Sequence, residues 1–233
     1  ILVRIIGMLY RIPVVNIIGS EGNGIYGAAF NIYNIMLVLS SYGLPMAVSK
    51  LVSARFTKKR YKSAAKVLRC SLMVAVCTGG IAALLVFFGA SFIENVIYGG
   101  GLPGLAVPLR ILAPTIFLVA ILGVIRGFFQ GQSTMIPTAV SQILEQIVNA
   151  IVSIAAGYGM MKAFASLPDV AAYGAAGSTL GTAMGALTAV LFMGFLYAVY
   201  TPTFNRLKRK DRHTENQSTG QICKIIIYTM IPI

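Results

Sequence analysis

The chain has 233 residues, of which 57% are hydrophobic and only 11% are charged, and its mean hydropathy is +0.81. Soluble domains carry about 25% charged residues, so this composition excludes an ordinary soluble domain and predicts an all-α polytopic membrane protein. The net charge of +13 would favour nucleic acid in a soluble protein, but here the basic residues cluster in loops, so we expect membrane lipids and no nucleic acid as partners.

Six apolar segments are long enough to cross a membrane, which takes about 20 helical residues. We place them at 1–18, 25–51, 66–90, 107–130, 137–161 and 172–200, with the start of a seventh near Ile222. The chain opens and closes within apolar segments, which indicates a piece of a longer protein. We therefore expect a six-helix lobe over 1–200, a basic inter-lobe loop over 201–221 and the truncated start of a second lobe over 222–233.

Basic residues alternate from one predicted loop to the next. Residues 55–62 and 206–212 each hold five Lys or Arg, whereas the loops after the first and third segments hold none. Cytoplasmic loops of membrane proteins carry the excess of Lys and Arg. The pattern predicts a multi-pass protein of the plasma or inner membrane whose N-terminus and basic loops are cytoplasmic.

The first segment carries two arginines, Arg4 and Arg11, which lie seven residues apart. They share one helix face and are separated by about 10 Å along the axis. Guanidinium groups stay charged and bind phosphate in a bidentate manner. Arg11 is the better candidate for a cavity cation, because Arg4 is equally well explained as a residue that reaches the membrane interface.

The second segment has a polar stripe and residues that can break or bend its helix. Asn31 and Asn34 lie on the stripe, and Gly43 and Pro45 follow near the end of the segment. Glycine and proline loosen or kink a helix. The sequence leaves two interpretations open, a packing kink and a gating hinge.

The stretch 123–149 joins the fourth and fifth segments by a short turn and carries a second polar stripe. Its members fall within about 100° of arc on a helix; they are Gln142, Glu145, Gln146 and Asn149. A carboxylate in hydrocarbon costs about 2.5–3.5 kcal/mol, so such residues usually face a bundle interior or a watery cavity. Arg126 is a candidate ion-pair partner for Glu145, with Gln130 as the alternative partner.

The sixth segment places Gly177, Gly181 and Gly185 at intervals of four residues. Small residues at this spacing allow two helices to approach closely. We expect this ridge to pack inside the bundle.

No motif for enzyme chemistry appears. Cys70, Cys77 and Cys223 form no metal or disulfide pattern, and His213, the sole histidine of the sequence, lies in a basic loop. We therefore predict no catalytic residue, no metal site and no cofactor.

Three stretches resemble a known family. YRIPVVNIIGSEGNGIYGAAFNIYNI, SYGLPMAVSKLVSARF and RGFFQGQSTMIPTAVSQILEQIVNA look like the stage V sporulation protein B group, which belongs to the superfamily of multidrug, oligosaccharidyl-lipid and polysaccharide exporters. The third stretch is the most specific. The resemblance implies two six-helix lobes that rock about a central cavity, of which this chain is the N-terminal lobe. It also implies that Arg4 and Arg11 occupy the part of the fold where related lipid flippases bind pyrophosphate.

The leading hypothesis is a flippase for a polyprenyl-pyrophosphate-linked saccharide, such as a peptidoglycan or spore-cortex precursor of the cell wall. An alternative is a cation-coupled multidrug exporter with Glu145 as the proton or sodium site. Two cations on the first segment disfavour it, because they repel cationic drugs. A third hypothesis is a membrane scaffold without transport activity, in which the polar stripes are helix–helix contacts.

Overall fold

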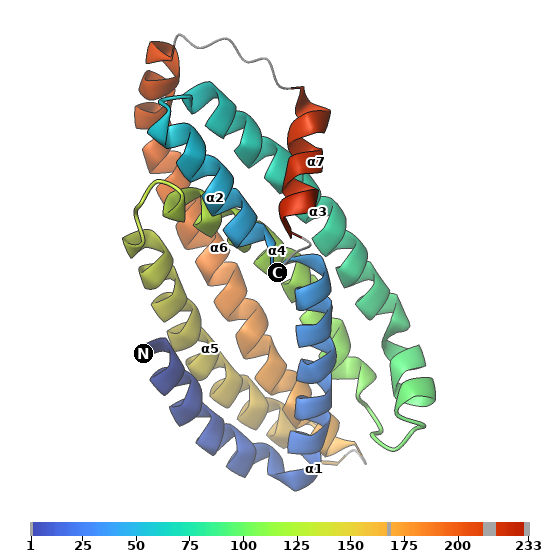
Figure 1. The fold of residues 1–233 in the computed structure, drawn as a ribbon. Helices are drawn as coiled ribbons and strands as arrows, with labels where there is room; N and C mark the ends of the chain where they lie inside the picture. The colour runs from blue at the N-terminus through green and yellow to red at the C-terminus, as the bar shows by residue number, and fades with distance from the viewer. Residues whose placement is uncertain (1, 167–168, 212–217, 231–233) are drawn as a thin grey trace.

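The fold is a bundle of long helices (Figure 1), here described from a computed structural model. The structure describes residues 2–166, 169–211 and 218–230, with side chains from Ile5 onward, and these ranges contain no strand. The helices are α1 (Leu2–Ser40), α2 (Leu44–Thr57), α3 (Tyr61–Phe92), the short π-helix η1 (Ile93–Ile97), α4 (Ala106–Gln130), α5 (Ile136–Ala163), α6 (Val170–Lys210) and α7 (Thr219–Met230).

A sharp turn at Gly19 divides α1 into two arms. Gly19 has φ 70° and ψ −174°, a conformation that only glycine adopts at low cost. The first arm, Leu2–Ile18, and the second arm, Ser20–Ser40, therefore form the V drawn in blue in Figure 1. The expected loop after the first segment is thus reduced to one residue, because the helix resumes at Ser20.

Five candidate membrane spans follow from the length and composition of the described helices, and the first of them is broken. That span, Ile5–Thr57, is 53 residues long and folds back on itself at Gly19, so it supplies both of the first two predicted crossings. The remaining four are Tyr61–Ile97, Ala106–Gln130, Ile136–Ala163 and Val170–Lys210. The prediction of an all-α polytopic membrane protein is confirmed.

A second break separates α1 from α2. Ser41, Tyr42 and Gly43 form a turn whose backbone groups bond to one another: the Ser41 N–H donates to the Leu37 carbonyl at 2.8 Å, and the Leu44 N–H donates to the Ser41 carbonyl at 3.1 Å. Pro45 lies in the first turn of α2, where its missing N–H leaves no bond unmade. The helix is therefore broken beside Gly43 and Pro45, and whether this break is a packing kink or a gating hinge stays a prediction.

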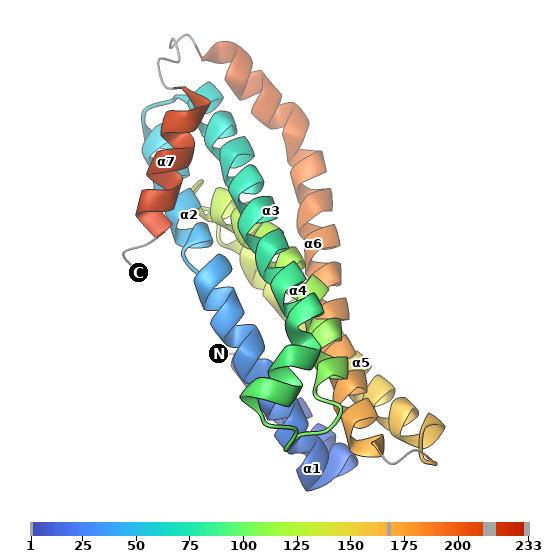
Figure 2. The same ribbon diagram turned by 90° about the vertical axis from the view of Figure 1, so that its right-hand side faces the viewer.

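The basic segments gather at one end of the bundle. Figure 1 shows the α2–α3 junction and the C-terminal end of α6 together at the top, and Figure 2 shows the same grouping after a quarter turn. The Asp211 carboxylate, just after α6, accepts a hydrogen bond of 2.9 Å from the backbone N–H of Lys62 in the first turn of α3. We call this the basic end; the turn at Gly19 and the first turns of α4 and α6 lie at the opposite end (Figure 1).

The expected loop over 201–221 is wrong in its first half. α6 continues to Lys210, and it ends with Lys208, Arg209 and Lys210 in its last turn. Basic side chains stabilise a helix C-terminus because they face the negative end of the helix dipole. Buried Phe204 also anchors this extension, since its ring stacks on that of Phe56 with centroids 6.1 Å apart.

Two apolar cores hold the bundle together, one at each end. The core at the end opposite the basic end contains Ile18 and Ile25 of α1, and Leu105 and Leu109 at the start of α4. The core of the basic end joins α2, α3, α4, α6 and α7; its fully buried side chains include Leu44, Phe128, Phe204, Ile222 and Ile226. The break at Ser41–Gly43 lies at the transition between the two cores.

The glycine ridge of α6 packs against α5, as predicted. A methyl group on Gly177 would meet the Ala156 carbonyl, and one on Gly181 would meet Ser153. At Gly185 the obstacle is the Glu145 carbonyl oxygen, 2.7 Å from the position of a Cβ atom. α6 therefore supports the back of α5, the helix that carries the second polar stripe.

Candidate functional site

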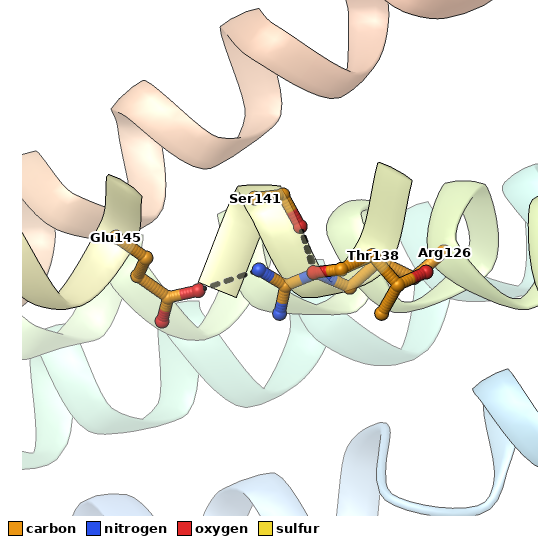
Figure 3. Close-up of polar contacts among 4 residues, drawn as sticks. All are labelled: Arg126, Thr138, Ser141 and Glu145. Atoms are coloured by element: carbon orange, nitrogen blue, oxygen red, sulfur yellow. Dashed lines mark hydrogen bonds and ion pairs between the residues drawn. The ribbon is translucent and has the colours of Figure 1, made fainter. Parts of the chain in front are cut away.

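An ion pair joins α4 to α5 inside the bundle. Arg126 Nη2 donates to Glu145 Oε2 at 2.7 Å, and Arg126 Nε donates to the Ser141 hydroxyl at 2.9 Å (Figure 3). The Ser141 hydroxyl donates onward to the Thr138 carbonyl oxygen at 2.8 Å. The side chains of Arg126 and Glu145 are only 15% and 22% exposed. Of the two partners considered for Arg126, the structure gives Glu145.

Next to this pair lies a cavity of about 330 Å³, at the lower limit of the 300–1,000 Å³ found for small-molecule sites. The end of the second arm and α2 form one wall, α4 forms the floor and α5 forms the other wall. The lining residues are Leu37, Ser41, Tyr42, Pro45, Met46, Val119, Gly123, Arg126, Gln130, Thr138 and Gln142. Gln130 at the end of α4, Thr138 in the first turn of α5 and Ser41 of the α1–α2 break all line it, so the cavity lies toward the basic end.

Glycines of α4 determine how closely α2 approaches this floor. A Cβ atom on Gly127 would lie 2.6 Å from the Pro45 carbonyl oxygen, and one on Gly131 would lie 2.7 Å from Val52 Cβ. Gly123 also contacts Pro45. The three glycines recur every four residues, so the same spacing that reveals the α6 ridge would have revealed this one.

The α5 stripe divides into two parts. Gln142 is exposed and lines the cavity, and Glu145 is paired with Arg126. Asn149 is only 6% exposed, and its amide Nδ2 donates to the Tyr10 hydroxyl of the first arm at 3.2 Å. Gln146 is half-buried beside Gly7 of the same arm. Cavity-facing residues therefore occupy the start of the stripe, and interhelical contacts occupy its end.

Asn149 belongs to a buried polar network. The Ser153 hydroxyl lies 2.9 Å from Asn149 Oδ1 and 2.8 Å from the Ser178 carbonyl oxygen of α6. Together with Tyr10, these residues connect the first arm, α5 and α6. Hydrogen bonds of this kind hold helices in register within a membrane bundle.

Arg11 is exposed on the first arm. Its guanidinium is near enough to Tyr26 of the second arm to interact with it electrostatically. The side chain of Arg4 lies outside the described part of the structure.

Asn31 and Asn34 are exposed on the second arm and are not part of the cavity lining. Gly43 is buried, and a Cβ atom there would lie 2.7 Å from the Met230 carbonyl oxygen of α7. Close packing against α7 thus accounts for the glycine. Pro45 forms part of the cavity wall.

The described residues contain no group of three His, Cys, Asp or Glu side chains that could hold a metal ion. The polar groups of the cavity lining are amides, hydroxyls and the guanidinium of Arg126. Such groups offer hydrogen-bond donors and acceptors.

Comparison with known protein families shows to which family this chain belongs. The model of a family described as polysaccharide biosynthesis protein matches residues 1–221. The chain belongs to this family. Its long apolar helices make it a multi-pass membrane protein.

Three proteins of Bacillus subtilis (strain 168) are similar in sequence. The lipid II flippase MurJ is 35% identical over 167 residues, which are 69% of this chain and 31% of MurJ. Stage V sporulation protein B is 31% identical over 191 residues, 82% of this chain and 35% of the relative. The uncharacterized membrane protein YabM is 28% identical over 232 residues, 99% of this chain and 41% of YabM. The expected resemblance to the stage V sporulation protein B group is confirmed.

Solved transporter structures share the fold of this family member. A MATE transporter in complex with MaD3S superposes with a TM-score of 0.75 at 15% identity, over 99% of this chain and 50% of the transporter. A MOP superfamily transporter from Pyrococcus furiosus gives 0.71 at 17% identity, over 99% and 49%. The chain thus spans about half of these transporters and corresponds to one lobe, as expected.

Proposed function

We propose that the protein is a flippase that moves a polyprenyl-pyrophosphate-linked saccharide, such as a peptidoglycan or spore-cortex precursor, across the plasma membrane. The sequence similarity to a lipid II flippase and to a sporulation protein supports this substrate class. The observation that carries the proposal is Arg11, an exposed and permanently charged residue within a membrane-spanning arm.

In the proposed mechanism, Arg11 and Arg4 neutralise the diphosphate as it leaves the inner leaflet. Asn31 and Asn34, together with the α5 stripe, bond to sugars or hold the lobes in register. Gly43 and Pro45 allow the bundle to adjust while the two lobes of the whole protein alternate access. The basic end and the N-terminus are cytoplasmic, and a proton or sodium gradient or the membrane potential drives the net movement.

The alternative of a cation-coupled multidrug exporter is less well supported. It needs Glu145 as a proton or sodium site, but Arg126 lies 2.7 Å from that carboxylate. A fixed guanidinium at this distance opposes the binding of a second cation. Glu145 therefore fits a structural or positioning role better than a coupling role.

A scaffold without transport activity remains the alternative from another functional class. Single cysteines at Asn34 and Gln142, both exposed, distinguish it from a transporter by their reaction with a water-soluble thiol reagent. A cysteine at buried Asn149 serves as the unreactive reference. We expect reaction at 34 and 142. A scaffold in which both positions are covered by helix contacts would leave all three unreactive.

The direct test is transport by Arg11 variants of the whole protein in proteoliposomes, with a fluorescent polyprenyl-diphosphate saccharide. A bond between a charged group and its partner contributes about 1.5–3 kcal/mol, so Arg11→Ala should slow translocation by roughly 10- to 100-fold. Arg11→Lys should retain part of the rate, because the charge is kept.

Arg110→Ala is the matched control, since Arg110 is also an exposed arginine, bonded through Nη2 to the Ser91 hydroxyl at 2.9 Å near the opposite end. It should transport at the normal rate. Normal transport by a folded, inserted Arg11→Ala protein would exclude the assigned phosphate site. Drug-stimulated ion flux without saccharide transport would favour the multidrug exporter.

A further inference from the structure

One hydroxyl at the cavity beside Arg126 has no hydrogen-bond partner. Thr138 lines this cavity and is 5% exposed, and its Oγ1 atom is buried without a partner in the structure. A buried polar group without a partner costs roughly 1–3 kcal/mol. Because Thr138 lies in the cavity wall, a ligand there could supply the missing bond once the hydroxyl turns toward it.

Other threonines of this protein show how unusual that hydroxyl is. Within the described helices, most donate to a backbone carbonyl three or four residues earlier; these are Thr57, Thr78, Thr115, Thr179, Thr188, Thr201 and Thr229. Thr138 lies in the first turn of α5, and the residue four positions earlier, Thr134, precedes the helix. The Met135 carbonyl, three residues earlier, accepts from the Ala139 N–H, and Thr138 Oγ1 makes no bond to it. Because a helical threonine has two favoured χ1 rotamers, rotation about one bond re-aims the hydroxyl without backbone movement.

The charge of the cavity is balanced. Glu145 is 2.7 Å from the guanidinium of Arg126, the one charged residue in the lining, so an additional phosphate would meet a carboxylate behind that cation. An additional cation would meet the guanidinium. A neutral ligand is favoured, because it avoids both repulsions.

The remaining lining matches the chemistry of a sugar. Gln130 and Gln142 offer amide donors and acceptors, and Ser41 and Thr138 offer hydroxyls. Tyr42, which is 67% exposed, provides an aromatic surface for the apolar face of a sugar ring. We propose that this cavity is a saccharide subsite that holds an uncharged sugar unit of the substrate, with Thr138 and Gln142 as specificity-determining residues.

This inference rests on the proposed function and assigns separate places to the two parts of the substrate. The first arm and α5 run in the same direction, since Tyr10 contacts Asn149 and Gly7 lies beside Gln146. Gln142 precedes Asn149 by seven residues, or roughly 10 Å along the helix axis. The diphosphate at Arg11 and the sugar in the cavity would thus bind at different levels of the same lobe.

The test compares two ligands on the whole protein in nanodiscs: a short polyprenyl diphosphate that carries one N-acetylhexosamine, and the same polyprenyl diphosphate without sugar. Loss of a hydrogen bond of up to about 1.4 kcal/mol weakens affinity up to about tenfold. Thr138→Val should therefore weaken binding of the sugar-bearing ligand by about tenfold and leave the sugar-free ligand unaffected. Gln142→Leu should behave in the same way, and Thr138→Ser should restore the sugar-bearing ligand.

Thr182→Val is the matched control, because Thr182 also carries a buried hydroxyl without a partner but does not line the cavity. It should change neither affinity. Thr138→Val should fold normally, because valine has nearly the same shape as threonine and lacks only a hydroxyl that has no partner. The melting temperature of this variant should therefore equal or exceed that of the parent protein.

The outcomes separate this inference from the proposed function. Translocation of the saccharide with equal ligand preference in Thr138→Val and the parent would overturn the subsite and leave the flippase intact. A preference for the sugar-bearing ligand that depends on Thr138, in a protein that translocates neither ligand, would support the subsite and refute the flippase. Equal weakening of both ligands would also overturn the subsite, because it would show a general loss of structure.

Discussion

At the scale of single residues, the unusual feature is a pair of opposite charges within membrane-spanning helices. Isolated charges are costly in a bilayer, and helices tolerate them when they pair inside a bundle or face water. Arg126 satisfies both conditions, because it bonds to Glu145 and Ser141 and also borders the cavity. Removal of one partner leaves the other charge uncompensated, whereas removal of both does not.

This asymmetry predicts the behaviour of a double-mutant cycle. Arg126→Leu and Glu145→Leu should each destabilise the protein, by up to about 3–5 kcal/mol for a fully buried pair and by less here, since the side chains are 15% and 22% exposed. The double variant should recover much of that loss. Thermal unfolding of the four proteins in one detergent measures the coupling, with Arg110→Leu as a control at an exposed arginine. Purely additive losses would show that the pair makes no contribution as a pair.

At the scale of elements, glycine ridges rather than interlocking side chains set the helix spacing. The α6 ridge meets Ala156 and Ser153 of α5, and the α4 ridge meets Pro45 and Val52 of α2. In both cases the atoms nearest to an added methyl group include backbone atoms. Backbone atoms do not rotate away as side chains do, so substitution at these glycines must separate the helices.

Gly127→Ala is therefore predicted to destabilise the protein by about 1–3 kcal/mol, because its methyl group would collide with the Pro45 carbonyl. Gly89→Ala on α3 is the control, since a Cβ atom there has nothing within 4 Å. It should be neutral or stabilising by up to about 1 kcal/mol, as expected for alanine in a helix. Melting temperatures of the two variants give the comparison; equal values would refute the close contact between α2 and α4.

At the scale of the whole molecule, the distribution of charge fixes the proposed orientation. The α2–α3 junction and the end of α6 bring the basic segments to one end, and the turn at Gly19 lies at the other (Figures 1 and 2). Cytoplasmic loops hold the excess of Lys and Arg. The basic end should therefore face the cytoplasm.

Labelling of single cysteines in intact cells checks this orientation. In a background with Cys70, Cys77 and Cys223 replaced by alanine, Ser20→Cys should react with a membrane-impermeant thiol reagent added outside. Lys58→Cys should react only after permeabilisation. Both positions are exposed in the fold, so a difference in labelling would come from the side of the membrane and not from burial. The reverse pattern would invert the topology and with it the direction of the proposed transport.

Long apolar segments are predictable from sequence, because hydropathy over 20 residues is a strong signal. The length of α6 could not be predicted in this way. The charged residues at 201–210 lower the hydropathy, although the helix continues to Lys210. Helical periodicity identified the stripe on α5 but not its division into cavity-facing Gln142 and buried Asn149, because periodicity gives a face and not its neighbours. Thr138 could not be found from sequence, since a hydroxyl lacks a partner only in relation to the folded structure.

The α4 ridge has a consequence for how this family member changes during evolution. Gly123 and Gly127 bring the backbone of α2 against α4, so the width of the cavity is set by positions that contribute no side chain. Exchanges at Tyr42 or Gln142 alter which groups meet a ligand and keep the width constant. Exchanges at the glycines alter the width itself. In the proposed subsite, the groups that face a ligand and the width of the cavity are thus set by separate residues, so one can change while the other is preserved.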